Sequence, residues 1–326
     1  GGNPKYIADE FLQRNSSYDL VWLVTSYDKM VPDKIRQVKI NSWAGLYELA
    51  TAKVWISNIR NHHPIKKRKE QIYLQTWHGS FGPKLVEKDA EYSLSRRYVK
   101  EAKRDGEIAD AIIADNEFQK KLYQKSFWLS KNVEILCIGA PQNDSLINKN
   151  KERDSFRNKY QFGDKFVVLY APSFRDDHSV DAYRLNFTEI LDCFQKKTKK
   201  KCMIVVRLHP NAAYKCDFIQ YTDTIVNGSM YPEITELSIA ADCLITDYSS
   251  VCYDFVLLNK PVFLCALDLD IYEKNRGLLK EFYSYPFSIS QSTTQLLKNI
   301  SVYDEKKYKE AVDSYFSLLK IYGDGH

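Results

Sequence analysis

Residues 243–258, Cys-Leu-Ile-Thr-Asp-Tyr-Ser-Ser-Val-Cys-Tyr-Asp-Phe-Val-Leu-Leu, contain the pattern that decides the fold class. The apolar run at 243–246 predicts a short buried strand. The small polar turn at 247–250 interrupts this run, and a helix is expected over 248–258. A buried strand that leads through a tight polar turn into a helix is the first half of a parallel βαβ unit.

The same alternation of strand and helix recurs along all 326 residues. Further short apolar runs predict strands at 20–24, 54–56, 72–77, 111–114, 134–138, 166–170, 203–208 and 262–266. Helix-like stretches lie at 42–52, 91–106, 117–128, 144–160, 186–199 and 304–320. Such alternation predicts an α/β fold of two Rossmann-like domains with parallel sheets that face a cleft. We expect the domains to cover 1–150 and 151–326, with the last helix packing on either of them.

Composition narrows the class of protein. Hydrophobic residues make up 44% and charged residues 27% of the chain, which is an ordinary globular balance. The seven cysteines are scattered without a C-x-x-C motif, which indicates buried, reduced thiols of a cytoplasmic protein. No apolar run approaches the roughly 18 residues that a membrane span needs. No signal peptide is visible either.

Positive charge is concentrated in two runs, Lys66–Lys69 and Lys196–Lys201, although the net charge is only +5. Such runs attract anionic lipid, nucleic acid or polyphosphate, or they are simply solvated loops and helix ends. Neither run has interleaved aromatic residues suited to base stacking. Nucleic acid is therefore not an expected partner, whereas an anionic membrane surface is.

Two histidines follow predicted strands directly. His78 comes after the strand at 72–77, and His209 after the strand at 203–208. Open parallel sheets bind ligands beyond the carboxyl ends of their strands. An imidazole at such a place can take up a proton or donate to a phosphate, although a structural, hydrogen-bonded histidine is the alternative for each.

Two other predicted strands end in polar residues suited to an anion. Ser173 and Arg175 follow the strand at 166–170, and an arginine can bind phosphate with a forked pair of hydrogen bonds. Ser249 and Ser250 precede the helix at 248–258, where free N–H groups and hydroxyls form an anion site or merely cap the helix. The sequence has no P-loop, no G-x-G-x-x-G, no G-x-S-x-G and no metal-binding motif.

These residues belong to an ordered set of motifs that resembles the CDP-glycerol glycerophosphotransferases, which build teichoic acids and related capsule polymers. The matching stretches are Asn3-Pro4-Lys5-Tyr6-Ile7, Thr76-Trp77-His78-Gly79, Lys84 with Glu87-Lys88-Asp89, Gly139-Ala140-Pro141 with Asn143-Asp144, Tyr170 to Arg175, Arg207-Leu208-His209-Pro210, Leu244 to Val251 with Asp254-Phe255, Lys260-Pro261, and Arg276-Gly277. They occur in family order over nearly the whole chain.

The resemblance implies a GT-B fold and transfer of glycerol phosphate from CDP-glycerol to a hydroxyl of a lipid-linked or polymeric acceptor, with release of CMP. No cofactor or metal is expected. The expected catalytic residues are His78 as general base, Asp89 as its orienting group, and His209. The expected donor and phosphate contacts are Gly79, Ser173, Arg175, Arg207, Glu236, Asp247, Ser249, Ser250 and Arg276. Lys84 is expected on the acceptor side.

One position departs from the family pattern, and several alternatives stay open. Gln142 stands where the family usually carries an arginine, which removes a fixed positive charge. The motifs do not choose between glycerol phosphate and ribitol phosphate, nor between a primase and a polymerase. A GT-B glycosyltransferase that uses a sugar nucleotide and a non-enzymatic binder of anionic polymers are the other readings. The expected location is the cytoplasm, at the inner face of the plasma membrane.

Overall fold

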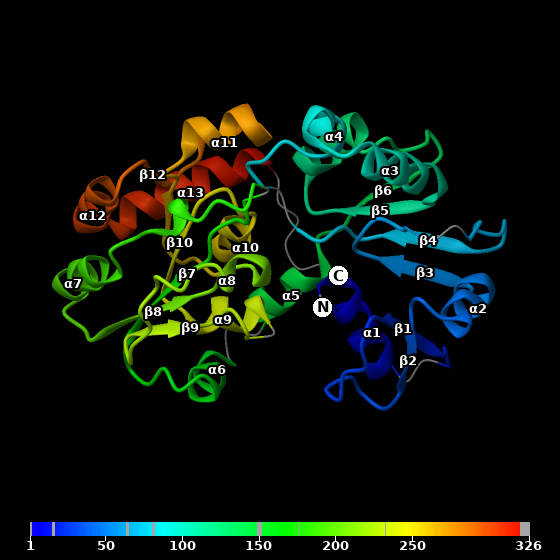
Figure 1. Cartoon of the computed structure of the whole chain (residues 1–326), viewed down its shortest axis with the longest axis horizontal. Coiled ribbons are helices and arrows are strands. Elements are labelled where there is room, and N and C mark those ends of the chain that lie inside the picture. Colours follow the sequence, from blue (N-terminus) through cyan, green and yellow to red (C-terminus); the bar gives the residue numbers. More distant parts are fainter. Residues whose placement is uncertain are drawn as a thin grey trace. The chain divides into compact units, whose positions relative to one another are not determined.

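The computed structural model describes residues 2–14, 17–62, 65–79, 82–148, 152–175, 177–231 and 233–319. Their contacts divide the chain into two compact units (Figure 1). Unit 1 contains the chain up to His78 and from Val86 to Gln142, and unit 2 contains Gly79–Leu85 and the chain from Asn143 onward. The sequence predicted one boundary at residue 150. The contacts put it after Gln142 and also assign the segment 79–85 to the second unit.

Unit 1 contains two parallel sheets. Its four-stranded sheet has the order β3-β4-β5-β6, formed by Val54–Ser57, Ile72–Gln75, Ala111–Ala114 and Glu134–Cys137. A separate parallel pair is formed by β1 (Leu20–Val24) and β2 (Ile35–Lys39). The helical elements are α1 (Asn3–Gln13), α2 (Trp43–Thr51), η1 (Glu87–Ser93), α3 (Arg96–Ile108) and α4 (Glu117–Ser126).

Side-chain caps fix where the helices of unit 1 begin. The hydroxyl of Ser42 accepts from the backbone of α2, that of Ser95 from α3, and the Asn116 carbonyl oxygen from α4. Each such cap satisfies an N–H group that has no partner inside the helix. Ser95 is the reason that α3 begins at Arg96, five residues after the start predicted from the hydrophobic pattern.

Unit 2 contains a six-stranded, fully parallel sheet in the order β12-β11-β10-β7-β8-β9. These strands are Ser288–Ser290, Val262–Cys265, Cys243–Thr246, Phe166–Tyr170, Cys202–Val206 and Ile225–Asn227. The helical elements are α6 (Arg153–Lys159), η3 (Asp181–Tyr183), α7 (Phe187–Thr198), α8 (Pro210–Ala213), α9 (Ile234–Ala240), α10 (Val251–Val256), α11 (Leu269–Arg276), η4 (Lys280–Ser284), α12 (Thr293–Val302) and α13 (Glu305–Leu319). β8, β10 and β11 are buried along their whole length, as a sheet covered on both faces requires.

The predicted class, an α/β fold with parallel sheets in two domains, is confirmed. All nine predicted strands exist, while β2, β9 and β12 were missed because they are polar or only three residues long. The single helix predicted over 144–160 is wrong. The described residues form α5 (Pro141–Asn148) and α6 there, and residues 149–151 lie outside the described part.

The last helix packs on unit 2. The Tyr308 hydroxyl in α13 donates to the Lys260 carbonyl at 3.1 Å, and the Phe316 ring meets that of Tyr253 edge-on at 5.4 Å. In the described part of the chain, no helix combines the length and the apolar character that a membrane crossing requires.

Candidate active site

His78 lies in a tight turn that follows β4. The strand ends at Gln75, and Trp77 has a φ of 53°, in the left-handed region. The exposed ring of His78 packs against that of Trp77 at a tilt of 35°, with a centroid separation of 4.2 Å, and its Nδ1 lies 2.9 Å from the Asn58 carbonyl oxygen. A carbonyl can only accept, so Nδ1 carries the proton of the neutral ring. This leaves the lone pair on Nε2, as a general base needs.

The Asn58 carbonyl is therefore the partner of His78 Nδ1, while the Asp89 carboxylate bonds to residues of α4. Asp89 Oδ2 accepts from the Ser126 hydroxyl at 2.6 Å and pairs with Lys125 at 3.0 Å. These bonds join η1 to the end of α4. Asp89 is therefore bonded to helical elements of unit 1, and its role in orienting His78 stays a prediction.

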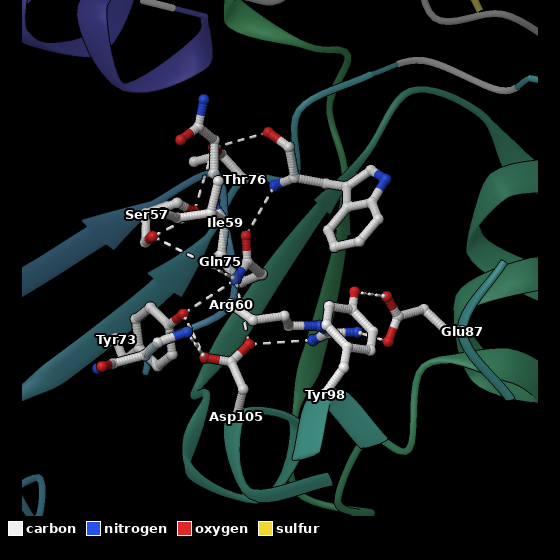
Figure 2. A network of polar contacts seen from close by, with 12 residues as sticks. Ser57, Ile59, Arg60, Tyr73, Gln75, Thr76, Glu87, Tyr98 and Asp105 are labelled. Atoms are coloured by element: carbon white, nitrogen blue, oxygen red, sulfur yellow. Dashed lines mark hydrogen bonds and ion pairs between the residues drawn. The ribbon is translucent and has the colours of Figure 1, made fainter. Parts of the chain in front are cut away.

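A buried charge cluster lies in the same part of unit 1 (Figure 2). The Arg60 guanidinium donates to Glu87 at 2.7 Å and to Asp105 at 3.0 Å, and all three side chains are at most 2% exposed. The Tyr98 hydroxyl donates to Glu87 at 2.5 Å, and the Tyr73 hydroxyl to Asp105 at 2.7 Å. Burial, followed by the neighbouring carboxylate charge, raises the pKa of both tyrosines, so they stay protonated donors.

Sequence reasoning missed this cluster, although a signal was present. Asp105 follows Ala102 by three residues on one face of α3, and both side chains are fully buried. A carboxylate on the apolar face of a helix needs a cationic partner. The sequence does not say that the partner is Arg60.

In unit 2, Asp247 holds the turn after β10. Its Oδ1 accepts from the backbone N–H groups of Ser173 at 2.7 Å and Tyr248 at 2.5 Å, and its Oδ2 pairs with Arg175 at 2.8 Å. The carboxylate is 2% exposed. It joins the end of β7 to the end of β10, which is a structural role, and its contact with the donor stays a prediction.

Arg175 was also expected to face the donor, yet its nitrogens are engaged inside the protein. Nε and Nη2 bind Asp268 at 2.6 and 2.9 Å, and Nη1 donates to the Ser173 carbonyl at 2.7 Å. The guanidinium also lies 4.9 Å from the Tyr272 ring centroid. With 4% exposure, Arg175 supports the turn instead of presenting a fork to a phosphate. Ser173 is buried beside it, and no described group bonds its hydroxyl.

His209 caps the short helix α8 and is exposed. Its Nδ1 accepts from the Asn211 backbone N–H at 3.2 Å, and its ring lies 5.0 Å from that of Phe174. A backbone N–H can only donate, so the neutral ring carries its proton on Nε2. The tautomer of His209 is therefore the opposite of that of His78.

Arg207 and Glu236 lie near one aromatic pair. Arg207 Nη1 donates to the carbonyls of Gly228, at 3.2 Å, and of Tyr231. Glu236 Oε2 accepts from the Tyr160 hydroxyl at 2.7 Å, and the Tyr160 ring stacks on Tyr231 at 4.7 Å. Burial lowers the pKa of Arg207, while Tyr160 opposes this shift.

The segment 79–85 brings further motif residues together in unit 2. A Cβ at Gly79 would lie 3.0 Å from the Ser250 hydroxyl oxygen, and one at Gly82 would lie 3.2 Å from Ser250 Cβ. Lys84 forms an antiparallel bridge with Leu278, which follows the Arg276-Gly277 motif at the end of α11. Lys84 was predicted in the first domain, and the contacts place it here instead.

The helix after Ser249 and Ser250 is short. α10 has six residues, and the Ser249 hydroxyl accepts from the Val251 N–H at 3.4 Å. An anion at this turn would therefore depend on hydroxyl and backbone donors more than on a helix dipole. The described residues contain no group of three or more His, Cys, Asp or Glu side chains placed to hold a metal ion.

Comparison with known proteins identifies relatives across the whole chain. Residues 1–326 match the profile of the family described as CDP-Glycerol:Poly(glycerophosphate) glycerophosphotransferase. The teichoic acid poly(glycerol phosphate) polymerase of Staphylococcus epidermidis is 29% identical, covering 96% of this chain and 46% of its own length. The teichoic acid glycerol-phosphate transferase of Staphylococcus aureus is 27% identical, and the match covers 99% of this chain and 86% of that relative. The chain thus spans about half of one relative and most of another.

Ribitol-phosphate enzymes are similar as well. The teichoic acid poly(ribitol-phosphate) polymerase of Bacillus spizizenii is 27% identical over 337 residues, with 96% of this chain and 50% of the relative covered. Among solved structures, the wall teichoic acid polymerase TagF matches with a TM-score of 0.86 at 29% identity, covering 100% of this chain and 82% of that one. A TagF variant soaked with CDPG matches with a TM-score of 0.85 at 28% identity.

Proposed function

Because this chain belongs to the CDP-glycerol:poly(glycerophosphate) glycerophosphotransferase family, we propose that it transfers glycerol phosphate from CDP-glycerol to a hydroxyl of a teichoic-acid-like acceptor. The acceptor oxygen attacks the β-phosphorus of the donor. One P–O bond forms, the P–O bond to CMP breaks, and the acceptor proton goes to a base. Transfer of this kind depends on positioning and charge stabilisation.

The observation that carries this proposal is the pair of opposite histidine tautomers. His78 donates through Nδ1 to a carbonyl, so the neutral ring has its lone pair on Nε2, the atom proposed to accept the proton of the attacking hydroxyl. His209 accepts at Nδ1, so its Nε2–H is a donor suited to the diphosphate and the departing CMP. The two rings are therefore suited to different tasks, one to accept a proton and the other to donate a hydrogen bond.

The donor phosphates would be held by Ser249, Ser250 and the backbone at Gly79. Gly79 lies close to Ser250 and has no side chain, so a phosphate could approach the backbone at this position. Arg276 and Lys84 are the cations proposed for the polyol phosphate, since Arg276 ends α11 two residues before Leu278, the bridge partner of Lys84. Glu236 and Arg207, beside the Tyr160–Tyr231 pair, are proposed for the nucleoside.

The acceptor and the location also belong to the proposal. We propose a polymeric or lipid-linked acceptor at the inner face of the plasma membrane, in teichoic acid or capsule synthesis. The exposed side chains of Lys66, Arg68 and Lys69 would attract an anionic membrane surface or the anionic polymer. Association with anionic vesicles that does not fall with rising salt would contradict this part of the proposal.

A donor screen tests the reaction itself. Purified protein is incubated with a synthetic glycerol phosphate acceptor and, separately, with CDP-glycerol, CDP-ribitol and a UDP-sugar. We expect CMP release with CDP-glycerol, and a larger turnover than with CDP-ribitol. UDP release would favour the glycosyltransferase reading. No nucleotide release with any donor would favour an anionic-polymer binder.

The base assignment has a matched control. His78→Ala should lower the rate of CMP release by about 10²–10⁴-fold, the usual contribution of a general base. His62→Ala removes an exposed imidazole of the same unit, one that contacts Glu101 at 2.6 Å. It should leave the rate within about twofold of the original, since surface substitutions away from a site have small effects. Equal rates in the two variants would refute the role of His78.

A further inference from the structure

The backbone conformation of the turn that carries His78 is not one that its residues prefer. Trp77 adopts a φ of 53°, a region that non-glycine residues occupy rarely and at a conformational cost. Such a backbone persists only when its surroundings determine it. The contacts of the two preceding residues therefore show what keeps the imidazole in place.

Asn3 supplies two of these contacts from the first turn of α1. Its Nδ2 donates to the Thr76 carbonyl at 3.0 Å and to the Trp77 carbonyl at 3.2 Å. Its Oδ1 accepts from the Gln142 backbone N–H at 3.0 Å, and the residue is 2% exposed. One buried amide thus binds the two consecutive peptide oxygens that precede His78.

The other side of the turn rests on the polar network in Figure 2. The Trp77 N–H donates to Gln75 Oε1 at 2.9 Å, and Gln75 Nε2 donates to the Tyr73 hydroxyl at 2.9 Å and to Asp105 at 3.2 Å. The Arg60 guanidinium lies 5.1 Å from the Trp77 ring centroid. The backbone of Trp77 thus reaches the buried charge cluster through Gln75, and its indole ring packs against Arg60 of that cluster.

The segment before Arg60 completes the arrangement. Asn58 offers the carbonyl that receives the His78 Nδ1–H, and the Ile59 carbonyl accepts from Gln75 Nε2 at 3.1 Å. The ring of His78 is therefore bound to the same three-residue stretch that supplies Arg60. Any shift of the turn would lengthen the bond that sets the tautomer.

We infer that Asn3 is a positioning residue for His78, holding the strained turn so that the imidazole keeps its Nδ1–H tautomer and its aim. This inference rests on the proposed role of His78 as the base. A reacting group displaced by about 1 Å can cost roughly 10²-fold in rate. The amide acts through the peptide oxygens and does not itself meet the substrate.

Asn3→Asp tests this with little change in shape. The carboxylate keeps an oxygen for the Gln142 N–H but cannot donate to two carbonyls, and it repels them. We expect kcat to fall by about 10–100-fold while KM for CDP-glycerol stays within about twofold, because the proposed donor contacts lie in unit 2. Glu10→Ala, which removes an exposed side chain of the same helix, is the control and should keep kcat.

A second readout does not depend on turnover. In protein with ¹⁵N-labelled histidine, the His78 ring should show the Nδ1–H tautomer, and Asn3→Asp should change its nitrogen shifts while Glu10→Ala should not. If the unaltered protein releases no CMP from CDP-glycerol, the proposed reaction fails, but the ring spectra still test the role of Asn3. An unchanged ring spectrum overturns the inference. So does an unchanged kcat in active enzyme, or a loss of activity that merely follows loss of folded protein.

Discussion

Gly79 lies so close to Ser250 that a methyl group on its Cα would come within 3.0 Å of the serine hydroxyl. The glycine directly follows His78, and the serine ends the turn after β10. Gly79 and Ser250 are separated by more than half of the chain and lie side by side within unit 2. A side chain at this position would have to displace the Ser250 hydroxyl by a few tenths of an ångström.

We predict that Gly79→Ala raises KM for CDP-glycerol by about 5-fold, since displacing the Ser250 hydroxyl loses one hydrogen bond, which is worth about 1 kcal/mol. Ser250→Ala should raise KM to a similar degree. The double variant should be no worse than either single one, because the clash disappears with the hydroxyl. Strictly additive effects in this double-mutant cycle would show that the contact does not matter.

Gly82 also lies close to Ser250, and a substitution there should affect stability. A Cβ there would lie 3.2 Å from Ser250 Cβ, which cannot rotate away as a hydroxyl can. We expect Gly82→Ala to lower the free energy of unfolding by about 1–3 kcal/mol, as overpacking does elsewhere. Urea denaturation measures this free energy.

Gly163→Ala has open space around it but a φ of 55°. It should lower the free energy of unfolding by about 1 kcal/mol through backbone strain alone.

The opposite tautomers predict unequal tolerance of glutamine at the two histidines. Glutamine has an N–H donor but is no base at neutral pH. His78→Gln should therefore lower kcat by about 10²-fold or more. His209→Gln, which keeps a donor near Nε2, should retain more activity than His209→Ala by about 10-fold. Equal losses for alanine and glutamine at His209 would mean that donation is not its role.

The strand-end histidines could be predicted because their position is local information. Each follows a short, mostly apolar strand, and within a parallel sheet the carboxyl ends of the strands lie at the same edge. The support around them is not local. Asn3 and Arg60 become important through polar partners 27 or more residues away, such as Thr76, Glu87 and Gln142. No periodicity in the sequence records those pairings.

Arg175 shows why residue type alone misled. An arginine beyond a buried strand has the chemistry of a phosphate ligand, and the sequence cannot reveal that Asp247 and Asp268 surround it. Burial, opposed by these two carboxylates, leaves the pKa of the guanidinium raised, so it stays charged in the fold. A guanidinium that already pairs with Asp247 and Asp268 has few N–H groups left to bind a ligand.

Removing that ion should damage the fold more than the chemistry. Arg175→Met leaves Asp247 and Asp268 buried without their cation, and we expect the free energy of unfolding to fall by about 3–5 kcal/mol. Lys306→Met removes one partner of an exposed pair with Glu310 at 4.0 Å and should change it by less than about 0.5 kcal/mol. Guanidinium denaturation of both variants gives the comparison. A stable Arg175→Met protein with a raised KM for CDP-glycerol would instead restore the role as donor contact.

Gln142 is where the chain departs from the family pattern, and its surroundings say what the arginine would change. Its backbone N–H donates to Asn3, so the main chain at this position supports the His78 turn whatever the side chain is. Gln142→Arg should therefore keep kcat and the KM for CDP-glycerol while adding a positive charge. If the acceptor is an anionic polymer, its KM should fall at low salt, and the gain should shrink as salt rises, because exposed charges are screened over about 10 Å at 0.1 M.

Gln142→Lys would give the same trend in acceptor KM with a point charge, and Gln142→Glu should reverse it. An acceptor KM that ignores all three substitutions would place acceptor recognition elsewhere on the protein.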